Sequence, residues 1–421
     1  MKKILISTIW VLSLIAVCPA QERWTLEQCI DYALVHNLEI RNDDYASDIR
    51  KAASRGKAYA LLPTVDASAG KDFGWTSEKH TKTAEISVNA RIVLFHGGTM
   101  QYERLAAKED FIASELTAQD TRNRICMDVT RSYLQILLAE QLLNYRKDNL
   151  VSSLKQRNHT EILVLAGSQP QSALSRMEAQ VAEDRTSVIE AECDLRNCRL
   201  ALSQLLDLPC GVLLATVEEQ LGETGPPPAV TPVMINGYTS RHERVLSSRH
   251  KVEMALNAHR AARTASMPEI VLTGGYGTHY DGSYEKPVSE QFKGNSYPYV
   301  GISISIPIFT GLQMYTRVKQ SEIELRMAEI YAAGTVNSLQ QEMERAVIEA
   351  DNSYARYISS VENVKALEAL LSVTEARYNA GAATALDYTI ARSDLIKAVS
   401  DCMINKWQYV YQLRIIDMYK R

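Results

Sequence analysis

Histidine, cysteine and glycine-rich segments are the parts of this sequence that could bind a metal, form a disulfide or hold a phosphate. His242 and His250 lie eight positions apart in a charged segment. That spacing on a charged helix is typical of a solvated face and not of a metal site. The glycine-rich stretch TGGYGTHYDG around Gly274 is not followed by a helix that could present its amides to a phosphate. We therefore expect it to be a closely packed or curved strand.

The cysteines do not form a ligand or redox pattern. Six remain if the first 20 residues are removed: Cys29, Cys126, Cys193, Cys198, Cys210 and Cys402. They contain no CxxC pair and no Cys/His ligand spacing. Most are expected to act as small apolar residues within helices. A disulfide is the alternative, because an exported protein can form one. No nucleophile and base can be paired, so we expect no enzyme, no cofactor and no bound metal.

Residues 1–20 have the pattern of a secretory signal peptide. Lys2 and Lys3 precede an apolar run, and a small residue, Ala20, ends the segment. Lipoprotein processing at Cys18 is an open alternative, although Val17 is bulkier than the residue that such processing prefers. The formal net charge is −4 and becomes −6 without the two lysines, which argues against nucleic acid as a partner.

An internal repeat organises the rest of the chain. Phe95 in VLFHGG and Phe309 in PIFTGL are 214 positions apart, and so are Gly167 and Gly381. We expect a first structural repeat over 21–206 and a second over 233–421. The proline-containing segment 207–232 between them is expected to be a linker.

Each repeat is expected to contain a helix, two strands and a long helical hairpin. In the first repeat we expect a helix over about 25–61, strands over 64–75 and 84–95, a helix over 99–165, and a helix ending near 206. In the second repeat we expect strands over 269–280 and 297–309. The hairpins should turn near Gly167 and Gly381, because glycine adopts the left-handed conformation of a helix end without steric cost.

The strands alternate between apolar and polar residues, as in a membrane barrel around water. Four strands cannot close on themselves, so several protomers would have to share one barrel. Five aromatic residues could form its interfacial girdle: Trp75, Tyr276, Tyr280, Tyr297 and Tyr299. The alternative from alternation alone is an ordinary sheet that covers a soluble core.

The long helices need neighbours along most of their length. A helix of 67 residues extends about 100 Å, which is deeper than a single globular core. Apolar residues near the second turn fall three and four positions apart, as in a coiled coil: Val364, Leu367, Leu371, Thr374 and Tyr378.

In the order in which they occur, these motifs resemble the TolC-like family of outer-membrane efflux ducts over nearly the whole mature chain. WTLEQCIDYALVHNLEIR resembles the opening helix of the family, with Leu38 where a proline often stands. VLFHGG and PIFTGL resemble its repeated strand-to-helix junction, here Phe95, Gly97, Gly98, Phe309 and Gly311. RYNAGAATALDYTIARSDL resembles the tip of its second hairpin.

The resemblance implies an α+β membrane protein that forms a homotrimer. Each chain would give four strands to a twelve-stranded β-barrel in outer-membrane lipid, continued by a long α-helical coiled-coil tunnel in the periplasm. A periplasmic adaptor (membrane fusion) protein and an inner-membrane pump would dock at the hairpin tips, at Ala166, Gly167, Ser168, Ala380, Gly381 and Ala382. The implied function is the exit duct of a tripartite efflux pump or of a type I secretion system.

The resemblance also implies a periplasmic gate near the tips. Tyr378 matches a latch residue, and Asp387 matches a ring of three carboxylates that would favour cations. Three family positions differ: Ala173 replaces an aspartate, Ile390 a second acidic residue and Ala383 an arginine. The competing hypothesis is a periplasmic coiled-coil scaffold or adhesin with a soluble β-sheet.

Overall fold

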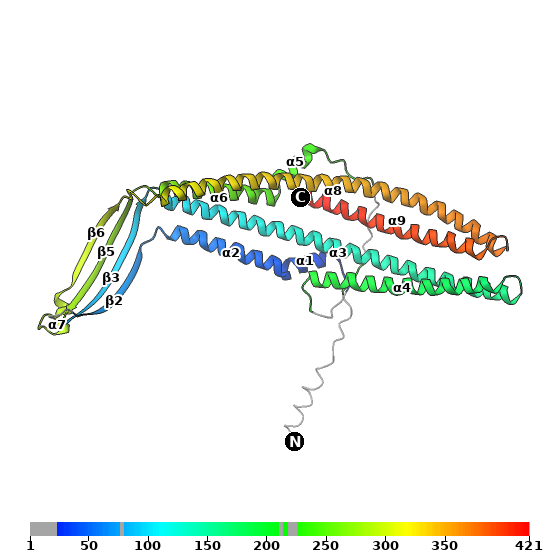
Figure 1. Ribbon diagram of the computed structural model, residues 1–421, viewed down its shortest axis with the longest axis horizontal. Helices are drawn as coiled ribbons and strands as arrows, with labels where there is room; N and C mark the ends of the chain where they lie inside the picture. Colours follow the sequence, from blue (N-terminus) through cyan, green and yellow to red (C-terminus); the bar gives the residue numbers. More distant parts are fainter. Residues whose placement is uncertain (1–22, 76–79, 210–213, 218–224, 421) are drawn as a thin grey trace, which may run out of the picture. The chain divides into compact units, whose positions relative to one another are not determined.

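The computed structural model describes residues 23–75, 80–209, 214–217 and 225–420 (Figure 1). The expected signal segment 1–20 and Cys210 lie outside these residues. The chain forms two compact units. Unit 1 combines Met1–Arg41, Thr121–Tyr238 and Gln340–Arg421, whereas unit 2 combines Asn42–Asp120 and Thr239–Leu339. Each unit draws on both sequence halves, so the units do not follow the two expected repeats.

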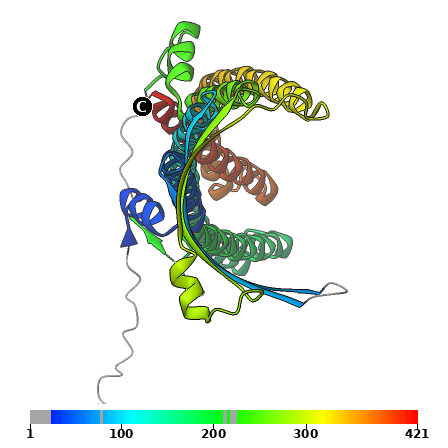
Figure 2. The same ribbon diagram turned by 90° about the vertical axis from the view of Figure 1, so that its left-hand side faces the viewer.

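Unit 2 contains a four-stranded antiparallel sheet. Its strands are β2 (Thr64–Trp75), β3 (His80–His96), β5 (Glu269–Asp281) and β6 (Tyr297–Ser305), in the order β2-β3-β5-β6. The central pairing joins β3 of the first sequence half to β5 of the second. Figure 2 shows that the sheet is curved. β2 and β6 are its two edges.

The register gives this sheet one apolar and one polar face. Val88 lies opposite Tyr276, and Leu272 lies opposite Ile302. Because side chains alternate along a strand, these pairs define the apolar face, which carries Val65, Ala67, Ala69, Phe73, Ile86, Val88, Ala90, Ile92, Leu272, Tyr276, Val300, Ile302 and Ile304. The polar face carries Asp66, Ser68, Asp72, Glu85, Ser87, Asn89, Arg91, Thr273 and Ser303.

Tyr297 and Tyr299 lie on the polar face, which corrects their expected place in the girdle. Tyr297 is opposite Gly277 and Tyr299 is opposite Gly275, positions on the face of Asn89. A Cβ atom on either glycine would lie 2.5 or 2.8 Å from these rings. The glycines therefore let both rings lie across β5.

Two hydrogen bonds extend this arrangement to β3. Tyr297 Oη donates to Glu85 Oε1 at 2.6 Å, and Tyr299 Oη donates to Asn89 Oδ1 at 2.9 Å. The two tyrosines thus connect the edge strand β6 to β3 over the intervening strand.

β6 ends at Ser305, four residues before the expected end at 309. Pro307 follows, and proline has no N–H to donate to a sheet ladder. β3 is longer than the expected 84–95 and contains an irregularity between Val93 and Phe95. A short helix, α7 (Val288–Gly294), lies in the loop before β6, where none was expected.

Helices α2 (Leu38–Tyr59) and α6 (Glu243–Thr264) lie largely or entirely in unit 2, together with the first parts of α3 (Thr99–Leu165) and α8 (Gln313–Asn379). His250 Nδ1 is 2.6 Å from Glu109 Oε2 of α3, and His242 is the N-cap residue of α6. The expectation that both histidines lie on a solvated face was therefore wrong, because α6 packs them against neighbouring groups.

Unit 1 contains α1 (Leu26–His36), α4 (Gln171–Leu205), most of α5 (Pro232–Arg241) and α9 (Ala385–Lys420), with the later parts of α3 and α8. A two-stranded parallel sheet joins β1 (Arg23–Trp24) to β4 (Ala215–Thr216). The main core contains buried side chains of α1, α3, α4 and α9, including Cys29, Val129, Tyr133, Ile136, Leu202 and Trp407.

Two further findings concern the described helices and the described cysteines. None of them is both long and apolar enough to cross a membrane. The described cysteines are free thiols, and burial raises the pKa of Cys29 to about 11.

The expected helix over 25–61 is interrupted at Asn37. This residue has φ −61° and ψ 128°, which is extended backbone. Its Oδ1 accepts from the N–H groups of Glu39 at 2.9 Å and Ile40 at 3.3 Å, and its Nδ2 donates to Leu205 O at 3.0 Å. The amide side chain thus starts α2 and fixes the break against the end of α4.

We expect Asn37→Ala to lower the free energy of unfolding by about 1–3 kcal/mol, because the cap is lost and the part-buried Leu205 carbonyl loses its donor. The measurement is guanidinium-induced unfolding in detergent, followed by far-UV circular dichroism. Asn37→Asp keeps the capping oxygen and should be less destabilising. Equal stability of the wild type and the alanine variant would contradict this role.

Candidate functional site

The two helical hairpins turn in the same way. Gly167 has φ +72° and Gly381 has φ +75°. The N–H of Gly167 donates to Val164 O at 2.9 Å, and that of Ser168 donates to Leu163 O at 2.9 Å. At the second turn Gly381 N donates to Tyr378 O at 3.0 Å and Ala382 N to Arg377 O at 2.7 Å. Both turns are therefore Schellman motifs.

The tips themselves are accessible. Ala166, Gly167 and Ser168 are exposed in the first turn, and Ala380, Gly381 and Ala382 are exposed in the second. A Cβ atom on Gly167 or Gly381 would meet no atom within 4 Å. Glycine is therefore required at both positions by backbone conformation and not by space.

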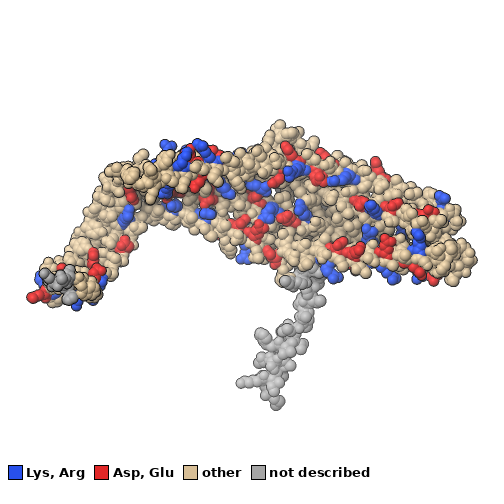
Figure 3. Space-filling view, in the orientation of Figure 1, with Lys and Arg blue, Asp and Glu red and all other residues tan. Residues whose placement is uncertain are grey.

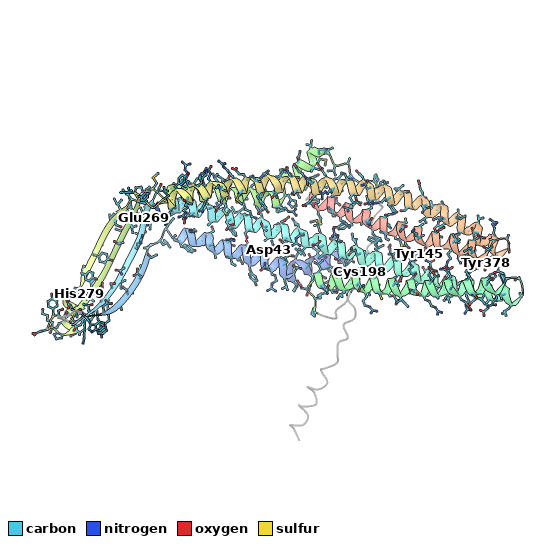
Figure 4. All side chains as sticks on the ribbon, viewed as in Figure 1. Asp43, Tyr145, Cys198, Glu269, His279 and Tyr378 are labelled. Carbon is cyan, nitrogen blue, oxygen red and sulfur yellow. The ribbon has the colours of Figure 1, made fainter. Side chains whose placement is uncertain are left out.

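Tyr378 connects the two hairpins near their tips. It lies at the end of α8 (Figure 4), and its side chain is only 1% exposed. Its hydroxyl lies 3.0 Å from Thr160 Oγ1 of α3 and donates to Gln169 Oε1 at 3.1 Å. Its ring stacks on Tyr388 at 5.4 Å between centroids. The sequence singled out Tyr378 but not these partners.

Asp387 is exposed and caps the start of α9. Its Oδ2 accepts from Thr384 Oγ1 at 2.7 Å and from Thr384 N at 3.0 Å, and its own N–H donates to Thr384 Oγ1 at 3.2 Å. The hydrogen bond from the Thr384 hydroxyl, its backbone N–H and the nearby Arg377 charge lower the pKa of Asp387. The carboxylate therefore stays ionised at neutral pH.

A buried ion pair forms a second connection between the hairpins. The side chains of Arg392 on α9 and Asp184 on α4 are 6% and 8% exposed, with Arg392 Nη2 3.2 Å from Asp184 Oδ2. Arg392 Nη1 also donates to Ser153 Oγ at 2.6 Å, and its Nη2 donates to Asn149 O. Ser153 Oγ in turn donates to Asp184 Oδ2. Three helices thus meet at one guanidinium.

Sequence reasoning missed this pair, although a signal for it is present. Along α4 the buried residues Met177, Val181, Asp184 and Val188 recur at spacings of four, three and four. Asp184 therefore occupies an apolar position of the helix, where a carboxylate requires a partner.

The strand-to-helix junctions differ in how tightly they pack. Phe95 is 49% exposed and Phe309 is 81% exposed. Gly97, Gly98 and Gly311 have positive φ. Leu312, at the position of the second junction that corresponds to Gly98, has φ +63°. A Cβ atom on Gly97 would lie 2.2 Å from Met267 Cβ, whereas one on Gly311 would meet nothing within 4 Å.

Within the described residues no three His, Cys, Asp or Glu side chains gather as ligands of a metal would. The candidate functional elements are instead a two-faced sheet, two helical hairpins and the contacts that join the hairpins. This arrangement is that of a structural scaffold.

Comparison with known proteins identifies the scaffold. The family model described as Outer membrane efflux protein matches residues 29–207 and 235–409. The outer membrane protein TolC of Escherichia coli (strain K12) is 22% identical over 423 residues, which covers 96% of this chain and 84% of that protein. The outer membrane efflux protein BepC of Brucella suis biovar 1 (strain 1330) is 21% identical over 358 residues, covering 85% and 75%.

Solved structures share the fold. A crystal structure of CusC gives a TM-score of 0.85 at 18% identity, covering 94% of this chain and 91% of that one. The Campylobacter jejuni CmeC outer membrane channel gives 0.82 at 19% identity, covering 94% and 84%. A family of efflux proteins is in keeping with the expectation of no enzymatic activity. The chain therefore belongs to the outer membrane efflux protein family, which confirms the resemblance to TolC-like ducts, and it is an outer-membrane protein with a large periplasmic part.

Proposed function

We propose that this protein is the outer-membrane exit duct of a tripartite efflux pump or of a type I secretion system. It would be a passive conduit for small molecules or proteins, driven by its inner-membrane partner. The observation that carries the proposal is the four-stranded sheet, with one apolar face, one polar face and two edge strands, β2 and β6. A sheet of this size cannot close alone, and lipid does not tolerate an open edge.

Three copies of the chain would close the barrel and leave no open sheet edge in lipid. If β2 of each copy pairs with β6 of the next, twelve strands close into a barrel, with the apolar faces toward lipid and the polar faces toward water. Side chains on α8 support contact between copies, because Ile323, Met327 and Ile330 are 49%, 64% and 73% exposed at coiled-coil spacing. A second copy of the chain is the partner that would cover them.

The duplication belongs to the same proposal. The halves 21–206 and 233–421 would be copies of one unit of strands and hairpin. Two matched features 214 positions apart support this: the Schellman turns at Gly167 and Gly381, and the positive φ angles of Gly97 and Gly311. The chain of each protomer would pass from the barrel into the tunnel at two junctions.

The hairpin tips would meet the periplasmic adaptor and, through it, the inner-membrane pump. The six exposed tip residues described above are the proposed docking positions. Tyr378 and Asp387 would belong to the gate, with Tyr378 holding the two hairpins of one protomer together. Asp387 would contribute one carboxylate to a ring of three.

Oligomeric state and conductance test the duct directly. The protein, extracted from outer membranes in detergent, should have three times the mass of the mature chain by native mass spectrometry. The same preparation should conduct ions in a planar bilayer. Recovery in the soluble periplasm without detergent and without trimers would reject the duct and leave the periplasmic scaffold or adhesin.

The proposed gate role predicts that Asp387→Asn shifts the reversal potential toward zero in a salt gradient, because cation selectivity falls when three carboxylates are lost. The lowered pKa of Asp387 means that wild-type selectivity should persist at pH values where an ordinary aspartate is already partly protonated, and fade only at lower pH. Asp394→Asn on the exposed face of α9 is the matched control. Unchanged selectivity of Asp387→Asn would remove Asp387 from the gate.

A further inference from the structure

The apolar face of the sheet carries two lysines at the end remote from the helices. Lys71 lies opposite Ala84, and Lys82 lies opposite Phe73, on the face that also carries Ala69 and Ile86. This end is where β2 ends and β3 begins, near His279 of β5 in Figure 4. Figure 3 shows charged groups at this end of the sheet and few along its middle.

The two lysines are grouped around one aromatic side chain. Lys71 Nζ lies 5.1 Å from the centre of the Phe73 ring, and Phe73 stacks on Trp75 at 6.3 Å. Lys82 is the cross-strand partner of Phe73. Tyr280 is opposite Ala84 on the same face. Lys71, Phe73, Trp75 and Lys82 are exposed.

The acidic residues of the paired strands at this end lie on the other face. Asp72, Thr83 and Asp281 form one row across β2, β3 and β5, and Glu85 lies on the same side. Within the described part of the chain neither Lys71 nor Lys82 forms an ion pair. Positive charge therefore collects on the apolar face, and negative charge collects on the polar face.

Lysines in this arrangement repel each other unless an anion lies between them. Diagonal neighbours on one face of an antiparallel pair have Cβ atoms about 7–8 Å apart, within reach of long side chains. Two flexible ammonium groups can converge on one phosphate, and a neighbouring phenol can donate a further hydrogen bond. Aromatic rings beside them are typical of the headgroup level of a membrane.

We propose that Lys71, Lys82 and Tyr280 form a binding site for the phosphate of an anionic lipid headgroup in the outer leaflet, with Phe73 and Trp75 at the boundary with the acyl chains. The inference rests on the proposed function, because it needs the apolar face to meet lipid and the strand ends to face the exterior. It adds a specific ligand class to a surface that would otherwise be a generic lipid contact. In a trimer the site would occur three times.

Native mass spectrometry of the detergent-solubilised trimer tests the site with two probes, bis-phosphorylated lipid A and its dephosphorylated form. We expect the wild type to retain the phosphorylated lipid about tenfold better, since each lysine near an anionic headgroup adds favourable energy. The double variant Lys71→Gln/Lys82→Gln should lose this preference. Arg91→Gln, on the polar face of β3 and paired with Glu269, should keep it.

Three outcomes would overturn the site: equal retention of the two lipids by the wild type, an unchanged preference in the double variant, or displacement of the lipid by millimolar inorganic phosphate. The comparison of the two lipids on the wild type needs no variant. It therefore tests the site even if the double variant fails to assemble. Trimer mass and bilayer conductance are recorded on the same preparation. A conducting trimer without lipid preference rejects only this site, whereas absence of trimers rejects the proposed duct.

Discussion

Gly97→Ala is expected to destabilise the protein by about 2–4 kcal/mol, through a left-handed backbone cost and a steric overlap that add together. Gly97 has φ +55°, and a Cβ atom there would lie 2.2 Å from Met267 Cβ and 2.7 Å from Thr264 O. Neither neighbour is the free end of a flexible side chain. The junction between β3 and α3 would therefore have to move away from the end of α6.

Guanidinium unfolding in detergent and the yield of folded protein measure this effect. Gly311→Ala is the matched control, because Gly311 has φ +61° but no atom within 4 Å of its Cβ position. It should show only the backbone cost of about 1–2 kcal/mol. Met267→Gly should partly rescue Gly97→Ala by removing the overlapping atoms. If the two alanine variants are equally unstable, packing against Met267 does not explain the requirement for glycine.

Arg392→Ala is expected to cost about 3–5 kcal/mol, because it leaves the Asp184 carboxylate buried without its cation. The variant also removes donors to Ser153 Oγ and Asn149 O, so the hydrogen bonds and ion pair that Arg392 makes from α9 to α3 and α4 are lost. Unfolding in guanidinium measures the stability. In the proposed duct, current through the closed gate should also rise, because a buried polar connection between the hairpins is gone.

Two comparisons separate this explanation from a general cost of losing an ion pair. Arg356→Ala removes an exposed ion pair with Glu349, whose side chains are 50% and 45% exposed, and should cost at most about 1 kcal/mol. The double variant Arg392→Leu/Asp184→Leu replaces the buried pair by apolar groups and should regain much of the stability. A double variant as unstable as Arg392→Ala would show that an unpaired charge is not the cause.

Local periodicity predicted much of the regular structure. The alternation at Val65 to Trp75 matches β2, and the absence of helix breakers between Thr99 and Leu165 matches α3. Along α8 the residues expected to pack, Val364, Leu367, Leu371 and Thr374, are half-buried, and Tyr378 is buried. These features depend on contacts a few positions apart, which a sequence displays directly.

Other features depend on contacts between distant residues and were missed. Nothing near Asn37 indicates that Leu205 will accept from its side chain, so a continuous helix was expected. The place of Tyr297 and Tyr299 follows from the alternation with Ser303, but their partners Glu85 and Asn89 are more than 200 positions away.

The same limit applies to the candidate site. Tyr378 and Asp387 were found through a family motif, whereas Thr160 and Gln169, the partners of Tyr378, lie on the first hairpin. The pair of Arg392 and Asp184 joins positions 208 apart. A charged residue at an apolar helix position indicates that a partner exists, but not which residue it is.

The strand order β2-β3-β5-β6 also determines when the sheet can form during biogenesis. β2 and β3 are complete by residue 96, but β5 begins only at Glu269 and β6 ends at Ser305. While the intervening residues are still being exported, the β2–β3 hairpin has a free edge and an uncovered apolar face, both of which promote aggregation. Pairing across such a sequence separation is slow. The strand order therefore leaves the first hairpin with an aggregation-prone edge and face until β5 and β6 are available to pair.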